Sequence, residues 1–211
     1  MLSDPTPTCR IGNLLPDFLP GGLLLSLPAG FQRGVALHHE IDRFTDAHPV
    51  FRRSLGRYSP SWRRYGGILT DIFYDHFLAE RWDHYSDLPL DEFIAQVHAA
   101  IDECRGDIPP EAFTRLDQMK RHDRLRSYRD MDGIRATLEG VDARLRKPVG
   151  LENSISELRL HYEDLLADFE EFFSQLSAHL SRLPPIPIVS GAPPGECGPA
   201  RRYTDGSQPG R

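Results

Sequence analysis

The sequence predicts an all-α protein, with a single helical bundle domain over residues 1–183 and a disordered tail over residues 184–211. Three observations lead to this prediction. Apolar residues recur at helical spacing along most of the first 183 residues. No segment shows the sustained alternation or the β-branched run that is typical of strands. Beyond residue 183 the composition changes to Pro, Gly and small polar residues, which cannot bury enough apolar surface to form a core.

The first two helices are separated by a loop that is rich in Gly and Pro. A helix is expected over residues 8–18, where Ile and Leu residues follow one another at intervals of three and four. The loop is expected over residues 20–30. The second helix is expected over residues 31–45, ending before Pro49, because proline disfavours helical geometry at the residue that precedes it.

Capping residues mark the helices in the middle of the chain. Ser59 and Pro60 are expected to be the cap and the first position of a helix that runs to Trp82, although two adjacent glycines weaken its start. Gly, Pro or a capping Asp then bounds each of three further helices, which are expected over residues 89–104, 110–127 and 130–145.

The last helix has the clearest signal in the sequence. Ser154 and Glu157 have the spacing of a capping box, so a helix is expected to start there. It is expected to run to about residue 183, because an apolar stripe continues along it: Leu158, Tyr162, Leu165, Phe169, Phe172, Leu176 and Leu180.

Composition excludes several classes of protein. The net charge of −6 argues against nucleic acid as the main partner, because phosphate binding needs an excess of clustered Lys and Arg. No apolar run approaches the roughly 20 residues of a membrane-spanning helix, and no signal peptide is recognisable, so a cytoplasmic location is expected. Cys9, Cys104 and Cys197 are far apart and odd in number, which favours free thiols over a disulfide framework or a zinc site.

Two helices carry His and Asp residues at spacings that suit a metal ion. On the helix over 31–45, His38 and Asp42 are four residues apart and therefore share one face. On the helix over 60–82, Asp71 and Asp75 are also four apart, and His76 follows within an apolar run. A divalent metal satisfies several buried carboxylates and imidazoles together, and this ligand mixture suits Mn, Fe or Zn better than Ca. The spacing is equally compatible with a hydrogen-bonded core histidine at His76 and with an Asp71–Arg ion pair.

These residues lie in blocks that resemble the bacterial acyl carrier protein phosphodiesterase family. The resemblance spans about residues 3–180. It is carried by GNLLPDF at 12–18, LHHEIDRFTD at 37–46 with His48 and Pro49, and DIFYDHFL at 71–78 with Trp82, and more weakly by YRDM at 128–131, Arg144, His161 and Tyr162.

The resemblance implies a helical, metal-dependent enzyme that is distantly similar to the HD-type phosphohydrolases. The family removes the 4'-phosphopantetheine arm by hydrolysing the phosphodiester that joins it to a serine of acyl carrier protein, with Mn²⁺ as the usual metal. Carried over to this chain, the resemblance implies His38, Asp75 and His76 as metal ligands. It implies Asp42 or Asp71 as a ligand or water-orienting base, and Asp17 as a further catalytic residue.

The resemblance also implies an acidic protein partner. Acyl carrier proteins are small and strongly acidic, so the arginine-rich stretch is expected to contact the carrier through Arg43, Arg53, Arg57 and Arg64. One departure concerns the start of the chain. Relatives begin with a segment that reads roughly Met-Asn-x-Leu-Ala-His, which Met1-Leu2-Ser3 lacks, so either Met1 is not the natural start or the chain is impaired.

Two other functions are compatible with the same sequence. One is an HD-type phosphohydrolase that acts on a nucleotide or another small phosphodiester, because the same metal site would serve it. The other is a catalytically inactive helical protein that binds an acidic partner. Metal content and activity on holo acyl carrier protein distinguish the three functions.

Overall fold

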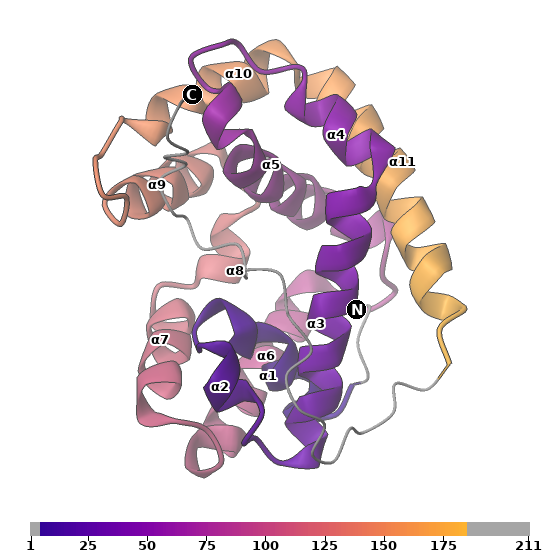
Figure 1. Cartoon of the computed structure of the whole chain (residues 1–211), viewed down its shortest axis with the longest axis vertical. Coiled ribbons are helices and arrows are strands. Elements are labelled where there is room, and N and C mark those ends of the chain that lie inside the picture. The colour runs from indigo at the N-terminus through magenta and orange to yellow at the C-terminus, as the bar shows by residue number, and fades with distance from the viewer. Residues whose placement is uncertain (1–4, 185–211) are drawn as a thin grey trace, which may run out of the picture. The chain divides into compact units, whose positions relative to one another are not determined.

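The computed structural model describes residues 5–184, and these form helices with no strand among them (Figure 1). The all-α prediction is therefore confirmed for the described chain. None of the described helices is both long and apolar enough to cross a membrane. The α-helices are α1 Pro7–Leu14, α2 Gly21–Leu24, α3 Ala29–Ala47, α4 Pro49–Leu55, α5 Gly66–Glu80, α6 Leu90–Glu103, α7 Pro110–Arg121, α8 Arg124–Ser127, α9 Met131–Asp142, α10 Ile155–Leu160 and α11 Tyr162–Ser181. Short 3-10 helices are η1 Leu15–Asp17, η2 Arg63–Tyr65, η3 Trp82–His84, η4 Cys104–Gly106 and η5 Leu151–Ser154.

The described residues fall into two compact units. Unit 1 contains residues 5–47, 83–126 and 174–184, and unit 2 contains residues 48–82 and 127–173. The predicted division at residue 183 remains a prediction, because the tail lies outside the described residues apart from Pro184.

The core of unit 1 forms where α1 and α3 pack closely together. A Cβ atom on Gly34 would lie 2.1 Å from the carbonyl oxygen of Cys9, and one on Gly12 would lie 2.2 Å from that of Phe31. Any residue larger than glycine would therefore force the two backbones apart. Apolar side chains from α1, α3, α6 and α7 fill the surrounding core, including Ile11, Phe31, Val35, Ile101 and Leu116.

The core of unit 2 surrounds α5, which contacts α4 and α9 (Figure 1). This helix is apolar on most of its circumference, as expected of a helix buried on several sides. Leu69, Phe73 and Phe77 on α5 have no more than 1% of their surface exposed. The Phe77 and Phe169 rings lie 5.9 Å apart, which joins α5 to the part of α11 that belongs to this unit.

Several predicted helix boundaries were wrong. The expected loop over 20–30 contains α2, and the arginine-rich segment after Pro49 forms α4, which was not predicted. The helix expected from Pro60 begins at Gly66. The helix expected over 110–127 breaks between α7 and α8, where Asp123 adopts a positive φ of 44°.

The predicted capping box at Ser154 does not form. The Ser154 hydroxyl donates to the carbonyl of Leu151 at 2.6 Å, within η5. The Glu157 carboxylate instead accepts hydrogen bonds from the backbone N–H and the hydroxyl of Ser59, at 3.0 and 2.8 Å. Ser59 is thus a partner of Glu157 and not a helix cap. The predicted last helix is also divided, because the backbone at His161 ends α10 before α11 begins.

Candidate active site

Unit 1 brings together three of the predicted site residues, Asp17, His38 and Asp42. His38 lies on α3, with Nδ1 2.8 Å from the carbonyl oxygen of Asn13 and Nε2 3.2 Å from Oδ2 of Asp42. A carbonyl oxygen only accepts, so Nδ1 carries the hydrogen and donates it to Asn13. The Nε2 atom therefore faces the Asp42 carboxylate.

The charges in this group favour a positive species beside Asp42. Burial alone would lower the pKa of His38, but the hydrogen bond to Asp42 and the negative charge of Asp17 outweigh it, so the pKa lies above its ordinary value. Surrounding protein atoms raise the pKa of Asp17 by displacing water, and the charge of His38 opposes this effect. A bound proton or a bound cation would both satisfy Nε2 and the two carboxylates.

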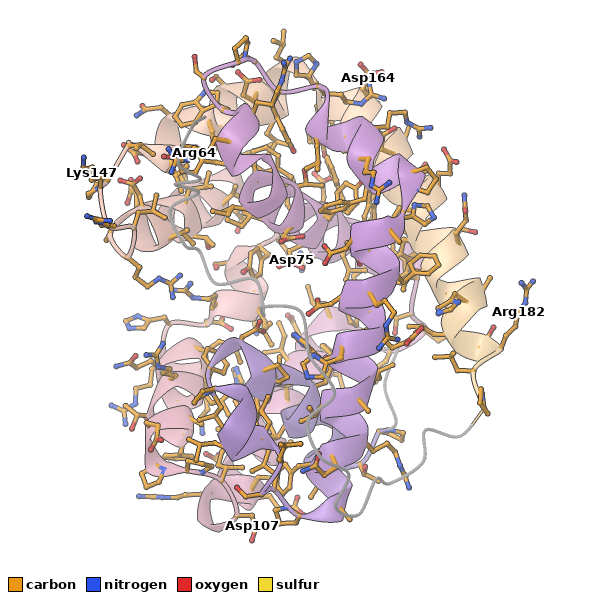
Figure 2. All side chains as sticks on the ribbon, viewed as in Figure 1. Arg64, Asp75, Asp107, Lys147, Asp164 and Arg182 are labelled. Atoms are coloured by element: carbon orange, nitrogen blue, oxygen red, sulfur yellow. The ribbon has the colours of Figure 1, made fainter. Side chains whose placement is uncertain are left out.

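Unit 2 holds the other three predicted residues, Asp71, Asp75 and His76, on α5. His76 is 1% exposed, and its Nδ1 lies 2.8 Å from the carbonyl oxygen of Tyr128, to which it donates. The Nε2 atom of His76 is buried and has no hydrogen-bond partner in the described chain. Asp75, labelled in Figure 2, is exposed, whereas Asp71 is half-buried. Leaving a buried acceptor unpaired costs about 1–3 kcal/mol, so this atom is expected to meet a ligand or water.

A close backbone contact positions the carbonyl that binds His76. A Cβ atom on Gly133 would lie only 1.8 Å from the carbonyl oxygen of Ser127, so the first turn of α9 packs directly on the residue before Tyr128. The N–H of Asp130 donates to the same Ser127 oxygen at 3.2 Å. These contacts fold the backbone over residues 127–130 tightly and thereby fix the direction of the Tyr128 carbonyl.

The two imidazoles share an arrangement that is common in metal-binding histidines. In His38 and His76 a backbone carbonyl binds Nδ1, so in the neutral imidazole the hydrogen lies on Nδ1 and Nε2 carries the lone pair. The donor chemistry of both residues therefore fits a divalent transition metal. In the described residues, however, no group of three or more His, Cys, Asp or Glu side chains is arranged to hold a metal. The predicted ligand set of His38, Asp75 and His76 includes residues of both units and remains a prediction.

The arginines predicted to contact a carrier protein have partners of their own. Arg53 and Arg57 both bind the buried Asp168 carboxylate, each at 2.7 Å. Arg53 also binds Glu171 at 2.7 Å, and Arg57 lies 3.1 Å from Asp164. These acidic partners compensate much of the positive charge that the sequence shows in this stretch.

The other two predicted arginines have smaller local contacts. Arg43 pairs with Glu40 on the same helix. The guanidinium of Arg64 lies 5.9 Å from the centre of the Tyr65 ring. The contribution of all four arginines to partner binding remains a prediction.

Sequence reasoning missed the backbone partners Asn13 and Tyr128, as well as the buried Asp168. Asn13 and Tyr128 lie within blocks of the family resemblance, but they act through carbonyl groups that every residue possesses. No sequence pattern distinguishes such a role. Asp168 lies among several acidic residues of α11, and nothing in the sequence distinguishes it from them, whereas the structure buries its carboxylate against Ser54 of α4.

Comparison with known proteins gives a consistent assignment. The family model for acyl carrier protein phosphodiesterase matches residues 1–176. The acyl carrier protein phosphodiesterase of Salmonella dublin is 33% identical over 172 residues, covering 81% of this chain and 89% of its own length. That of Klebsiella pneumoniae is 35% identical over 167 residues, covering 78% of this chain and 86% of its own. No solved structure matches the chain. The family model and these relatives together establish that the chain belongs to the acyl carrier protein phosphodiesterase family.

Proposed function

We propose that this protein is a metal-dependent phosphodiesterase that converts holo acyl carrier protein to the apo form. Water adds to the phosphorus of the 4'-phosphopantetheine linkage, and the bond from phosphorus to the carrier serine oxygen breaks. That oxygen takes up a proton, so the products are free 4'-phosphopantetheine and the apo carrier. The proposal rests on family membership and on the residues described above.

The observation that carries the metal dependence is the state of His76. Its Nδ1 donates to the Tyr128 carbonyl, while its buried Nε2 has no partner in the described residues. In the neutral imidazole this pattern places the lone pair on Nε2 and fixes its direction, which is what a metal ligand requires. We propose His38, Asp75 and His76 as ligands of a divalent metal, with Mn²⁺ as the expected ion.

A bound divalent metal supplies a water of lowered pKa and neutralises charge on the phosphoryl oxygens. The protein residues are proposed to hold the metal and to orient the attacking water. The carbonyl groups of Asn13 and Tyr128 keep both imidazoles in the tautomer with hydrogen on Nδ1. Asp42 lies next to His38 and is proposed to orient the attacking water or to accept its proton, as are Asp17 and Asp71. The cytoplasmic location expected from the sequence stays part of this proposal.

The test is incubation of the full chain with holo acyl carrier protein and Mn²⁺, followed by intact mass measurement of the carrier. We expect loss of the phosphopantetheine mass. His76→Ala should abolish this loss, whereas His84→Ala, at an exposed histidine of η3, should not change it. An intact holo carrier after prolonged incubation with the wild-type protein would refute the activity. Parallel incubation with cyclic and linear nucleotides tests the alternative of a small phosphodiester substrate.

A further inference from the structure

The loop that joins α9 to η5 in unit 2 is strongly basic. This segment, residues 143–150, is called the basic loop here. It contains Arg144, Arg146 and Lys147 and no acidic residue, and all three cations are exposed. Figure 2 shows Lys147 at the outer edge of unit 2, whereas Asp164 of α11 lies at the opposite side of the unit.

The cations of the basic loop are not compensated within the described chain. None of the three forms an ion pair there, whereas Arg53 and Arg57 share the carboxylates of α11. An unpaired exposed cation contributes its whole charge to the surrounding potential, and a paired one contributes far less. The basic loop therefore presents three uncompensated cations within four residues, whereas the charges of Arg53 and Arg57 are largely compensated.

The backbone of the basic loop is held in place although its side chains are free. The carboxylate of Asp142, which is only 8% exposed, accepts hydrogen bonds from the N–H groups of Val149 at 2.8 Å and Leu151 at 3.2 Å. Gly150 turns the chain with a φ of 75°, a conformation that favours glycine. Since the loop is already ordered, a partner that binds it has little backbone entropy to remove.

The basic loop and His76 are connected through α9. The first turn of α9 packs against the segment that binds His76, and its last residue is Asp142. A helix of 12 residues is about 18 Å long. This length is comparable with the size of a small domain, because a chain of about 100 residues has a radius of gyration near 13 Å. A carrier domain that contacts the basic loop is therefore large enough to reach along α9 toward the end of that helix that packs near His76.

We propose that the basic loop is the docking surface for the acidic carrier protein. This inference rests on the proposed function, since it takes acyl carrier protein as the substrate. Opposite charge accelerates encounter and orients the partner more than it changes the chemical step. The loop should therefore affect the KM for the carrier, and its salt dependence, and leave kcat nearly unchanged.

The test compares two triple variants with the same change in net charge. The first is Arg144→Glu, Arg146→Glu and Lys147→Glu. The matched control is Arg115→Glu, Arg159→Glu and Arg182→Glu, which replaces exposed arginines that form no ion pair in the described chain. Binding of holo carrier is measured by titration calorimetry at low and high salt, in parallel with steady-state kinetics and a thermal melt of each protein.

For the loop variant we expect the Kd and the KM to rise about tenfold or more at low salt, and the difference from wild type to shrink at high salt. The control should stay within about twofold, because dispersed charges steer weakly. Equal weakening by both variants would overturn the proposal, since it would show an effect of net charge alone. Unchanged carrier binding by the loop variant would also overturn the proposal. The same holds if the loop variant loses binding to a DNA duplex but still binds the carrier as the wild type does.

The binding and turnover measurements separate this inference from the proposed function. If the wild type and the loop variant bind and hydrolyse the carrier equally well, the docking surface is overturned and the activity still stands. A protein that binds the carrier through the loop without hydrolysing it supports the docking surface and refutes the activity. A wild-type protein that neither binds nor hydrolyses the carrier refutes both.

Discussion

The buried carboxylate of Asp168 is expected to be a principal stabilising group of unit 2, and Asp168→Asn tests this. Its side chain is 1% exposed. One oxygen accepts from Ser54 at 2.8 Å and Arg57 at 2.7 Å, and the other accepts from Arg53 at 2.7 Å. The substitution keeps the shape of the side chain but removes the charge that both guanidinium groups face.

The expected magnitude follows from burial on both sides of the ion pairs. Removing one partner of a fully buried ion pair costs about 3–5 kcal/mol, because a charge is left uncompensated. Here the side chains of Arg53 and Arg57 are 47% and 23% exposed, so water can solvate part of their charge. We therefore expect a loss of about 2–3 kcal/mol in the free energy of unfolding. For a protein of this size that corresponds to a fall of about 5–10 °C in Tm.

The measurement is urea and thermal unfolding followed by circular dichroism. Glu171→Gln is the matched control, because Glu171 also binds Arg53 but is 47% exposed. An exposed pair is worth about 0.2–1 kcal/mol, so the control should change stability by less than about 1 kcal/mol. If Asp168→Asn were as stable as Glu171→Gln, burial of the carboxylate would not be what makes these ion pairs stabilising.

Three further predictions concern pH, metal and backbone contacts. Burial alone would raise the pKa of Asp168, but its hydrogen bonds lower the pKa below the ordinary 3.8. The wild type should therefore be more stable than Asp168→Asn above about pH 5 and should lose this advantage as the pH falls through the lowered pKa. Denaturation measured as a function of pH will show this. Exhaustive chelation should abolish turnover, and added Mn²⁺ should restore turnover and raise the Tm. If the chelated protein were fully active while mass spectrometry showed that it held no metal, the metal dependence would be contradicted. Gly133→Ala should lower the Tm and change the ¹⁵N chemical shifts of the His76 ring, because the added Cβ would clash with the Ser127 carbonyl. The control Gly67→Ala should do neither, because the position has open space around it.

The sequence predicts the amphipathic helices well but not the points where they break. The helix expected over 89–104 corresponds closely to Leu90–Glu103. The apolar stripe of the last helix, by contrast, continues from Leu158 to Tyr162 without interruption, so its period gives no sign of the break at His161. Glu157 misleads for a related reason. Its spacing from Ser154 suits a local cap, but its actual partner is Ser59, 98 residues away in sequence.

Within the candidate site the sequence predicts one contact between side chains of the same helix but not the backbone groups that support the two imidazoles. The contact of His38 with Asp42 follows from their spacing of four residues on one helix. For His76 the sequence left a metal ligand and a core histidine equally open. The structure shows features of both, since Nδ1 has a partner in Tyr128 and the buried Nε2 has none. Backbone carbonyls carry no sequence signature, so this support was not predictable.

The sequence is also a limited guide to which positive charges are available to bind a partner. The sequence shows the sign and spacing of Arg53 and Arg57 but not the carboxylates of α11, which lie more than 100 residues away in sequence and compensate them. The cations at 144–147 are fewer, yet the loop that carries them contains no acid and forms no ion pair in the described chain. Free charge therefore depends on the fold and not on the local density of arginine. Salt screens the attraction between an exposed cation and an approaching acidic partner. A carrier that docks on the basic loop should therefore show a salt dependence that the loop variant loses, even though α4 keeps all its arginines.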